Sequence, residues 1–422
     1  MKHARAVLAL CAVLGGCAPL HSESSTLPPA AHEKCDGVQG YAESFDGRRT
    51  FTWRPQWLNL IKTDASAHAL RVRILARAEQ SLVGTAPTVM AKWGVPPSGD
   101  RHDYLSWPVY WWEAGPNEYE ARDGVINPES KSHRFDASAL KEMQTRVTAL
   151  SLGYFLNGDH RYSRKASELL AAWFVDPATA MNPNLDFSQM VPGKRPPTTI
   201  ESTRLVAVVE AIGLLDASGD FPPEIKQALE TWFSRYVDWM TGPRAPGDRL
   251  AANNWALSYD LQLVEFALFA GRIDVARAVV ERVPRDRIAK QISADGRLPA
   301  ETSRTHGLNY SIFALGLLFQ LADLGECLDV DLWSYQENGT GIRRALDFLI
   351  PFVGHEDKWP YEETKDREAI QGIRQQFKRV LLKAGWVYRA PGYFADAAAL
   401  AVDSSDGVSP GAWPPPTPDY LE

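Results

Sequence analysis

Apolar residues recur every three to four positions along most of the chain, a spacing typical of amphipathic helices. One run, for example, places Leu140, Met143 and Val147 on a single face. The pattern predicts helices over about 65–82, 136–154, 159–173, 205–215, 225–240, 253–268, 273–290, 310–325, 340–350 and 366–384. It contains no convincing run of strands, so periodicity alone indicates an all-α fold.

Polar residues at the starts of these runs are suited to helix capping. Asp136, Asp159 and one of the pair Asn253 and Asn254 precede apolar runs, and Asp and Asn are favoured N-cap residues. We therefore expect each of these three helices to begin at such a cap.

The segment 88–134 breaks the helical pattern. Its many Pro, Gly and Asp residues exclude a long helix, and the cluster around Trp107, Trp111 and Trp112 argues against disorder. A second irregular segment covers 177–199. Long loops of this kind in a compact domain are usually functional, although a packed lid over hydrophobic helices is an alternative for 88–134.

The N-terminus has the features of a targeting segment. Lys2 and Arg5 precede a short apolar run, and Leu14-Gly15-Gly16-Cys17 resembles a bacterial lipobox. We expect residues 1–16 to be a lipoprotein signal peptide and Cys17 to carry a lipid anchor. Because Ala18 is not an aspartate, a periplasm-facing outer-membrane lipoprotein is expected, with secretion to the periplasm as the alternative.

Composition suggests boundaries for the rest of the chain. Residues 17–36 are expected to form a flexible tether, 37–390 one helical domain, and 391–422 an irregular, Pro-rich tail. Outside the cytoplasm the remaining cysteines, Cys35 and Cys327, can pair or stay as two separate thiols.

Charge narrows the classes of partner. The chain has a net charge of −7, which becomes −9 once Lys2 and Arg5 leave with the signal peptide. An acidic protein is not a general binder of polyanions, and nucleic-acid binding finds no support. Any acidic polymer must be held by local arginines and lysines. No motif has metal-ligand or phosphate-loop spacing, so no metal or cofactor is expected.

Two short segments concentrate side chains suited to catalysis. The first, 295–310, opens as an Asp-Gly turn and carries Glu301, Arg304, His306 and Tyr310 at the mouth of a helix. The second, 252–260, contains the pair Asn253 and Asn254.

These two segments resemble the two halves of the catalytic site of the alginate lyase family of polysaccharide lyases. The resemblance extends over about 88–360, where 88–134 resembles the family's N-terminal part. The family reads Asn-Asn-His where this chain reads Asn253-Asn254-Trp255. Membership would imply an incomplete (α/α) toroid of paired helices that binds an anionic polysaccharide.

The resemblance implies catalytic roles for four residues. Asn254 and Arg304 would neutralise a uronate carboxylate, and Tyr310 would take and return a proton. His306 could partly replace the missing histidine. Each residue also has a plain structural interpretation: a helix cap for Asn254, an ion pair with Glu301 for Arg304, a half-buried helical tyrosine for Tyr310, and a polar loop histidine for His306.

Further residues are predicted to bind substrate through the same resemblance or through their position. They are Asn253, Trp255, Tyr259, His102, Tyr104, Gln189, Lys194 and Arg195.

The favoured activity is β-elimination in a 1,4-linked uronan, with tyrosine as base and acid. The polymer would be alginate, with poly-mannuronate preferred, or glucuronan. A catalytically silent glycan-binding protein on the lyase scaffold is one alternative. An (α/α) glycoside hydrolase is another, and would need two opposed carboxylates drawn from Asp123, Glu129 and Glu301.

Overall fold

A computed structural model describes residues 33–402 of the chain. The predicted signal peptide 1–16, the predicted anchor Cys17 and most of the predicted tether lie outside the described residues.

The helical body is built around an inner row of helices, each of which contacts the next. Its members are α3 (Ala137–Asn157), α5 (Arg204–Leu215), α7 (Asn254–Phe269), α11 (Gly307–Glu326) and α13 (Arg367–Val387). Around them lie α1 (Pro55–Thr63), α2 (His68–Ser81), α4 (His160–Phe174), α6 (Pro223–Thr241), α8 (Ile273–Val280), α9 (Ala289–Gln291), α10 (Pro299–Thr302), α12 (Ile342–Leu349) and α14 (Pro391–Ala399). The predicted all-α, incomplete (α/α) toroid is confirmed.

Helices α7 and α11 are buried along most of their length because they are surrounded by other helices. In α7, every residue from Ala256 to Phe269 is buried. Helix α11 is long and apolar enough to cross a membrane by composition, but most of that stretch is buried inside the protein. Its apolar character therefore reflects a central position in the core.

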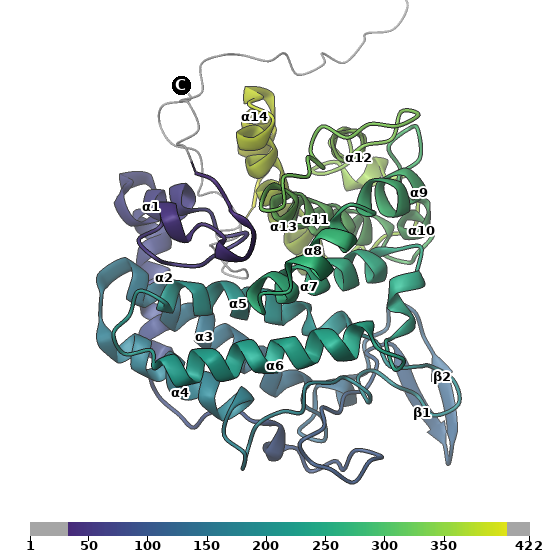
Figure 1. Cartoon of the computed structure of the whole chain (residues 1–422). Helices are drawn as coiled ribbons and strands as arrows, with labels where there is room; N and C mark the ends of the chain where they lie inside the picture. Colours follow the sequence, from purple (N-terminus) through teal and green to yellow (C-terminus); the bar gives the residue numbers. More distant parts are fainter. Residues whose placement is uncertain (1–32, 403–422) are drawn as a thin grey trace, which may run out of the picture.

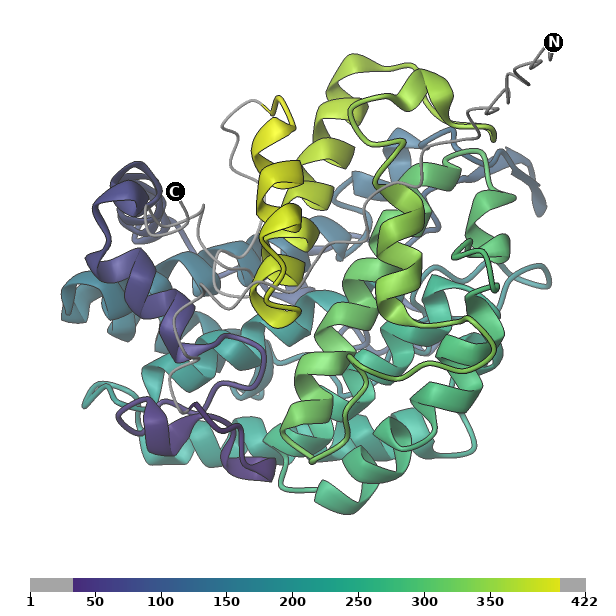
Figure 2. The ribbon, with the colours of Figure 1, turned by 90° about the horizontal axis from the view of Figure 1, so that it is seen from above.

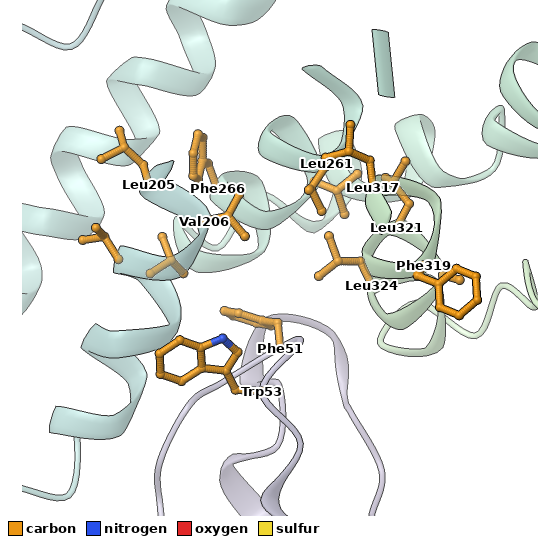
Figure 3. Packing of buried hydrophobic residues seen from close by; sticks show 14 of the residues in the cluster. Phe51, Trp53, Leu205, Val206, Leu261, Phe266, Leu317, Phe319, Leu321 and Leu324 are labelled. Carbon is orange, nitrogen blue, oxygen red and sulfur yellow. The ribbon is translucent and has the colours of Figure 1, made fainter. Parts of the chain in front are cut away.

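The N-terminal and C-terminal parts of the described chain lie on the same side of the body. Seen from above, the yellow C-terminal helices stand between the purple N-terminal segment and the green second half of the chain (Figure 2). Phe51 and Trp53 of the N-terminal segment point toward Leu205, Val206 and residues of α7 and α11 (Figure 3). The N-terminal segment is thus part of the core.

A buried carboxylate fixes this segment. Glu210 of α5 accepts hydrogen bonds from the backbone N–H groups of Phe51, Thr52 and Trp53 at 3.0, 2.8 and 3.0 Å. These bonds satisfy backbone donors that the insertion of Phe51 and Trp53 would otherwise leave unpaired in the core.

Cys35 and Cys327 form a disulfide with Cα atoms 4.4 Å apart. Cys35 is buried, and the N–H of Gly37 donates to the carbonyl of Cys327 at 2.8 Å. The end of the predicted 17–36 tether is therefore wrong: Cys35 is fixed to the C-terminal end of α11. Composition did not reveal this because the alternative of two separate thiols fitted the sequence equally well.

The predicted irregular tail 391–422 is wrong in its first part, because residues 391–399 form α14, which packs against α13. The segment 88–134 is non-helical apart from 3₁₀ turns, as predicted, but it contains an unpredicted antiparallel hairpin of β1 (Trp111–Gly115) and β2 (Glu118–Ala121). The hairpin projects from the edge of the helical body on the side of α10 (Figure 1).

Two of the three predicted caps are confirmed. Asp159 accepts from the N–H of Arg161, and Asn253 from the N–H of Trp255. Asp136 does not cap α3; its carboxylate instead accepts from the N–H of Leu105 at 2.8 Å and pairs with Lys92 at 3.0 Å. Asp136 thereby ties the aromatic segment to the helices.

Candidate active site

Tyr310 and Arg304 meet at the N-terminal end of α11. The Arg304 Nη2 lies 3.5 Å from the Tyr310 hydroxyl, and the guanidinium carbon lies 4.5 Å from the centroid of the phenol ring. The turn between α10 and α11 places Arg304 there, and Tyr310 lies in the first turn of α11. The two side chains to which the family resemblance assigned catalytic roles are therefore in contact.

The phenol of Tyr310 also has a second neighbour. The hydroxyl of Tyr110, from the segment before β1, lies 2.9 Å from the Tyr310 hydroxyl. Burial and then the Tyr110 contact raise the pKa of Tyr310 well above its ordinary value of about 10, and the positive charge of Arg304 opposes them. Arg304 favours the phenolate, but burial has the stronger effect on the pKa, so Tyr310 is a neutral phenol at pH 7.

Arg304 is bound to a carboxylate of the hairpin segment. Its Nη2 lies 2.6 Å from Asp123 Oδ1 and its Nε 3.2 Å from Asp123 Oδ2. The hydrogen bond from Arg304 holds the pKa of Asp123 below its ordinary value. Asp123 is about 40% exposed at its side chain, so a guanidinium with a bidentate carboxylate stands at the surface of the site.

The hairpin segment packs tightly on the turn before α11. Gly124 has φ +77°, and a Cβ there would lie 3.0 Å from both His306 Nε2 and Thr305 Oγ1. Thr305 also donates to Asp123 at 3.1 Å. Glycine is required at this point by both its conformation and the close approach.

His306 faces away from the phenol hydroxyl. Its Nδ1 lies 3.2 Å from Glu363 Oε1, and its ring centroid is 6.5 Å from that of Tyr310. Glu363 Oε2 also accepts from the N–H of Asn309 at 2.9 Å. The His306 ring thus binds Glu363, and its residue meets Tyr310 through the backbone, where the Tyr310 N–H donates to the His306 carbonyl at 2.9 Å.

The two asparagines have divided roles. Asn253 caps α7, whereas the Asn254 Nδ2 and backbone N–H donate to Glu301 at 2.8 and 2.5 Å. Asn254 and Glu301 are both buried. The alternative of an Arg304–Glu301 ion pair is therefore wrong, because Arg304 binds Asp123 and Glu301 binds Asn254.

Trp255 follows this pair and is stacked on an arginine. The guanidinium carbon of Arg195 lies 4.6 Å from the centroid of the Trp255 ring, and Arg195 Nη2 donates to Gln189 Oε1 at 3.1 Å. Gln189 has φ +48°, a conformation uncommon for a residue with a side chain. Its Nε2 donates to Glu201 at 3.2 Å. Four side chains thus connect the irregular segment 177–199 to the start of α7.

Two predicted substrate-binding residues are structural. Tyr104 is completely buried and donates to Glu201 at 3.0 Å, and Tyr259 is 2% exposed and donates to the carbonyl of Met240 at 2.5 Å. These assignments are wrong because each hydroxyl is used inside the core. His102 binds the carbonyl of Ala180 at 2.7 Å, and Lys194 is exposed beside Arg195.

The sequence did not single out Tyr110 or Glu363, and it named Asp123 only as a possible hydrolase carboxylate. Tyr110 lies in the aromatic cluster of the segment 88–134, and this cluster was the available signal. Asp123 and Glu363 are 181 and 57 residues from their partners Arg304 and His306, a separation at which local spacing carries no information.

Comparison with known proteins places this arrangement in a family. The model of the alginate lyase family matches residues 88–359. The chain belongs to the alginate lyase family. Residues 252–260 and 295–310, with Asn254, Arg304 and Tyr310, lie within the matched region, as does Trp255.

Solved structures agree with the assignment. An alginate lyase from Bacteroides ovatus is 33% identical with a TM-score of 0.79, and the match covers 83% of this chain and 95% of that one. Alginate lyase A1-III from Sphingomonas species A1 shares the fold at 17% identity, TM-score 0.51, covering 81% and 92%. A point mutant of alginate lyase A1-III complexed with a tetrasaccharide has 16% identity, TM-score 0.52, covering 77% and 88%. No curated protein sequence matches.

The protein is accordingly a polysaccharide lyase. The hydrolase alternative also lacks its acid pair, because Asp123 is bound to Arg304, and Glu301 is buried against Asn254. Glu129 accepts a hydrogen bond from Ser132 on the exposed surface.

Proposed function

We propose that this alginate lyase family member cleaves a 1,4-linked uronan by β-elimination, with Arg304 neutralising the uronate carboxylate and Tyr310 transferring the proton. The observation that carries the proposal is the contact of the Arg304 guanidinium with both the ring and the hydroxyl of Tyr310. A cation and a proton-transferring group side by side are what this elimination needs.

The first requirement is charge neutralisation. The proton at carbon five lies next to a carboxylate, so its removal builds negative charge there that a donor must stabilise. Asp123 supports this role for Arg304, because it already places a carboxylate in bidentate contact with the guanidinium. In the proposed complex the uronate carboxylate takes the place of Asp123. Asn254 at the start of α7 would support the same carboxylate through its second amide hydrogen, since one hydrogen of this group donates to Glu301.

The second requirement is proton transfer. A neutral Tyr310 is ready to protonate the leaving oxygen, and the charge of Arg304 favours the phenolate that must accept the carbon-five proton. One tyrosine can serve both steps only when the proton and the leaving oxygen lie on the same side of the sugar ring.

Trp255 gives the proposal its substrate preference. An indole nitrogen is a donor only, so Trp255 cannot accept a proton from the opposite side of the sugar. His306 is turned toward Glu363. We therefore expect poly-mannuronate, in which both groups lie on one side, to be preferred over poly-guluronate, whose inverted carbon five puts them on opposite sides. Glucuronan has the same configuration as poly-mannuronate at carbons four and five, so it also meets the one-sided requirement.

The test is a panel of uronans followed by absorbance of the unsaturated product end. We expect new ultraviolet absorbance from the wild type and none from Tyr310→Phe, which keeps the ring but loses the proton. Mass spectrometry of the products adds the second readout, since hydrolysis would add water to each cleaved chain. Saturated products would overturn the proposal.

Trp255 also favours one alternative, a catalytically silent glycan-binding protein, because it removes a proton acceptor while leaving an aromatic face with a stacked cation. This alternative predicts tight uronan binding, measured by calorimetry, without any product from the wild type. Rapid unsaturated-product formation would exclude it.

We further propose that Cys17 is acylated and anchors the protein to the periplasmic face of the outer membrane. The support is the Leu14-Gly15-Gly16-Cys17 motif. Cys17→Ser should move the protein to the soluble fraction on cell fractionation. Membrane association that persists in this variant would contradict the anchor.

A further inference from the structure

Arg195 is a cation of the site without a carboxylate partner. In the part of the chain that the structure describes, no carboxylate lies within ion-pairing distance of its guanidinium, and its one hydrogen bond goes to the neutral amide of Gln189 at 3.1 Å. Its Nε is buried with no hydrogen-bond partner. A half-buried guanidinium in this state has lost water without gaining a counter-ion, which is unfavourable unless a ligand supplies one.

Two other arginines that lie partly or wholly in the core are paired with carboxylates. Arg287 binds Asp260 at 2.7 Å, and Arg54 binds Asp323 at 2.9 Å and Glu326 at 2.7 Å. In those places the fold provides the carboxylate. Beside Arg195 it provides the face of Trp255 instead, which orients the guanidinium but forms no ion pair with it.

Arg195 and Arg304 belong to one site. Asn254 precedes Trp255 in the chain and is bonded to Glu301, which lies three residues before Arg304. Burial lowers the pKa of Arg195, and the positive charge of Arg304 lowers it further, whereas Asp248 and Glu201 oppose them. A chain of contacts through Trp255, Asn254 and Glu301 thus connects the two arginines.

We infer that Arg195, held on the face of Trp255, is a second carboxylate-binding position, which recognises the uronate next to the one that Arg304 binds. This inference rests on the proposed uronan substrate. A polymer with a carboxylate on every sugar presents two charges to the site at once, and two separate cations match it. A single uronate can use only one.

Trp255 is a positioning residue in this arrangement. A flat aromatic face matches the planar guanidinium, and it fixes the direction of the Nη groups. Trp255 cannot accept a proton as the family's histidine can, but it holds the Arg195 guanidinium in place for a neighbouring sugar.

The experiment uses the full protein with Tyr310→Phe, so that no ligand is consumed, and calorimetry with mannuronate monomer, mannuronate tetramer and a carboxyl-reduced tetramer. Arg195→Gln should weaken binding of the tetramer by about tenfold to hundredfold, the range of one charge-assisted hydrogen-bonded contact. Binding of the monomer should change less than twofold. The carboxyl-reduced tetramer should bind equally weakly with and without Arg195.

Further variants separate charge, geometry and folding. Arg195→Lys keeps the charge but not the planar fork, so it should recover part of the affinity. Trp255→Leu should lower the affinity for the tetramer as much as Arg195→Gln does. The double variant should show no further loss of affinity. Trp255→Phe keeps an aromatic face and should retain most of the affinity. Arg244→Gln is the matched control, because Arg244 is an exposed arginine paired with Asp186. Its tetramer affinity should stay within twofold.

The inference is overturned if tetramer affinity is unchanged in Arg195→Gln, or if the monomer loses as much as the tetramer. Additive losses in the Trp255→Leu, Arg195→Gln double variant would overturn the positioning role. Failure of the proposed function would give a different result. In that case the tetramer would still bind through its carboxylates and through Arg195, but the wild-type protein, which has Tyr310, would form no unsaturated product. This result would support Arg195 as a carboxylate-binding position and contradict the lyase reaction.

Discussion

The two ends of helix α11 use charge in opposite ways. At its C-terminal end, Asp323 is fully buried and binds both Lys383 and Arg54, and the disulfide of Cys327 lies beside them. At its N-terminal end, Arg304 is a quarter exposed and its carboxylate partner, Asp123, is 40% exposed. One helix thus carries a closed ionic cluster at one end and an open one at the other.

The difference indicates which charges stabilise the fold and which are available for a ligand. A buried pair in which both partners are satisfied has no capacity to bind anything else, and breaking it leaves an unpaired charge in the core. A partly exposed guanidinium loses little when its carboxylate is exchanged for another. Under the proposed function we therefore expect catalysis at the open end, next to Tyr310.

Lys383→Ala should have the largest effect on stability, because it removes one of the two cations that bind Asp323. The side chain is fully buried against Asp323 and also lies over the ring of Trp57. Removing it leaves the Asp323 carboxylate short of a counter-ion, so the free energy of unfolding in urea should fall by about 3–5 kcal/mol. Lys365→Ala, at an exposed lysine, is the control and should change little. A loss below about 1 kcal/mol in Lys383→Ala would contradict the comparison.

Arg304→Ala tests the open end. Removal of an electrostatic stabiliser of this kind should lower kcat/KM on the preferred uronan by about 10²–10³-fold. The melting temperature should stay close to that of the wild type, because the lost partner, Asp123, is exposed to water. Arg285→Ala, at a 78% exposed arginine paired with Asp286, is the matched control. Near-normal rates in Arg304→Ala would show that the Asp123 pair is purely structural.

The disulfide belongs to the closed end and should affect stability alone. Replacing both Cys35 and Cys327 by alanine should lower the free energy of unfolding by about 2–4 kcal/mol, since the bond closes a loop of 292 residues. Lyase rates below the unfolding temperature should be retained. A double variant with the same free energy of unfolding as the wild type would contradict a stabilising role for the disulfide.

The smallest predicted effect concerns pH. The contact with Tyr110 raises the pKa of Tyr310, so Tyr110→Phe should lower it. If proton removal needs the phenolate, kcat/KM should rise with pH through the alkaline range, and in Tyr110→Phe the rise should come at lower pH by up to about one unit. A rise at higher pH in the variant would contradict this assignment of the proton acceptor.

Periodicity predicted the helical body well because each helix buries an apolar face, which local spacing records. It also predicted the caps Asp159 and Asn253, which act over two residues. It missed α14 because Pro391 and a run of small residues give little periodic contrast. It missed the β1–β2 hairpin because that pairing lies within a loop whose residues are only half-buried.

The candidate site was predictable where its residues share a short segment and unpredictable where distant segments meet. Arg304 and Tyr310 are six residues apart, so one motif carried both. Asp123, Tyr110 and Glu363 reach the site from other elements. Tyr104 and Tyr259 have side chains that suit sugar binding, but both are buried in the core, which their residue types could not reveal.

The central claim is that the open end of α11 transfers protons from one side of the sugar only, because Trp255 cannot accept one. Initial rates of unsaturated-product formation on poly-mannuronate and poly-guluronate test it directly, in the wild type, Trp255→His and His306→Ala. We predict that the wild type cleaves poly-mannuronate far faster than poly-guluronate and that Trp255→His narrows this gap. Rapid wild-type cleavage of poly-guluronate that survives His306→Ala would contradict the claim.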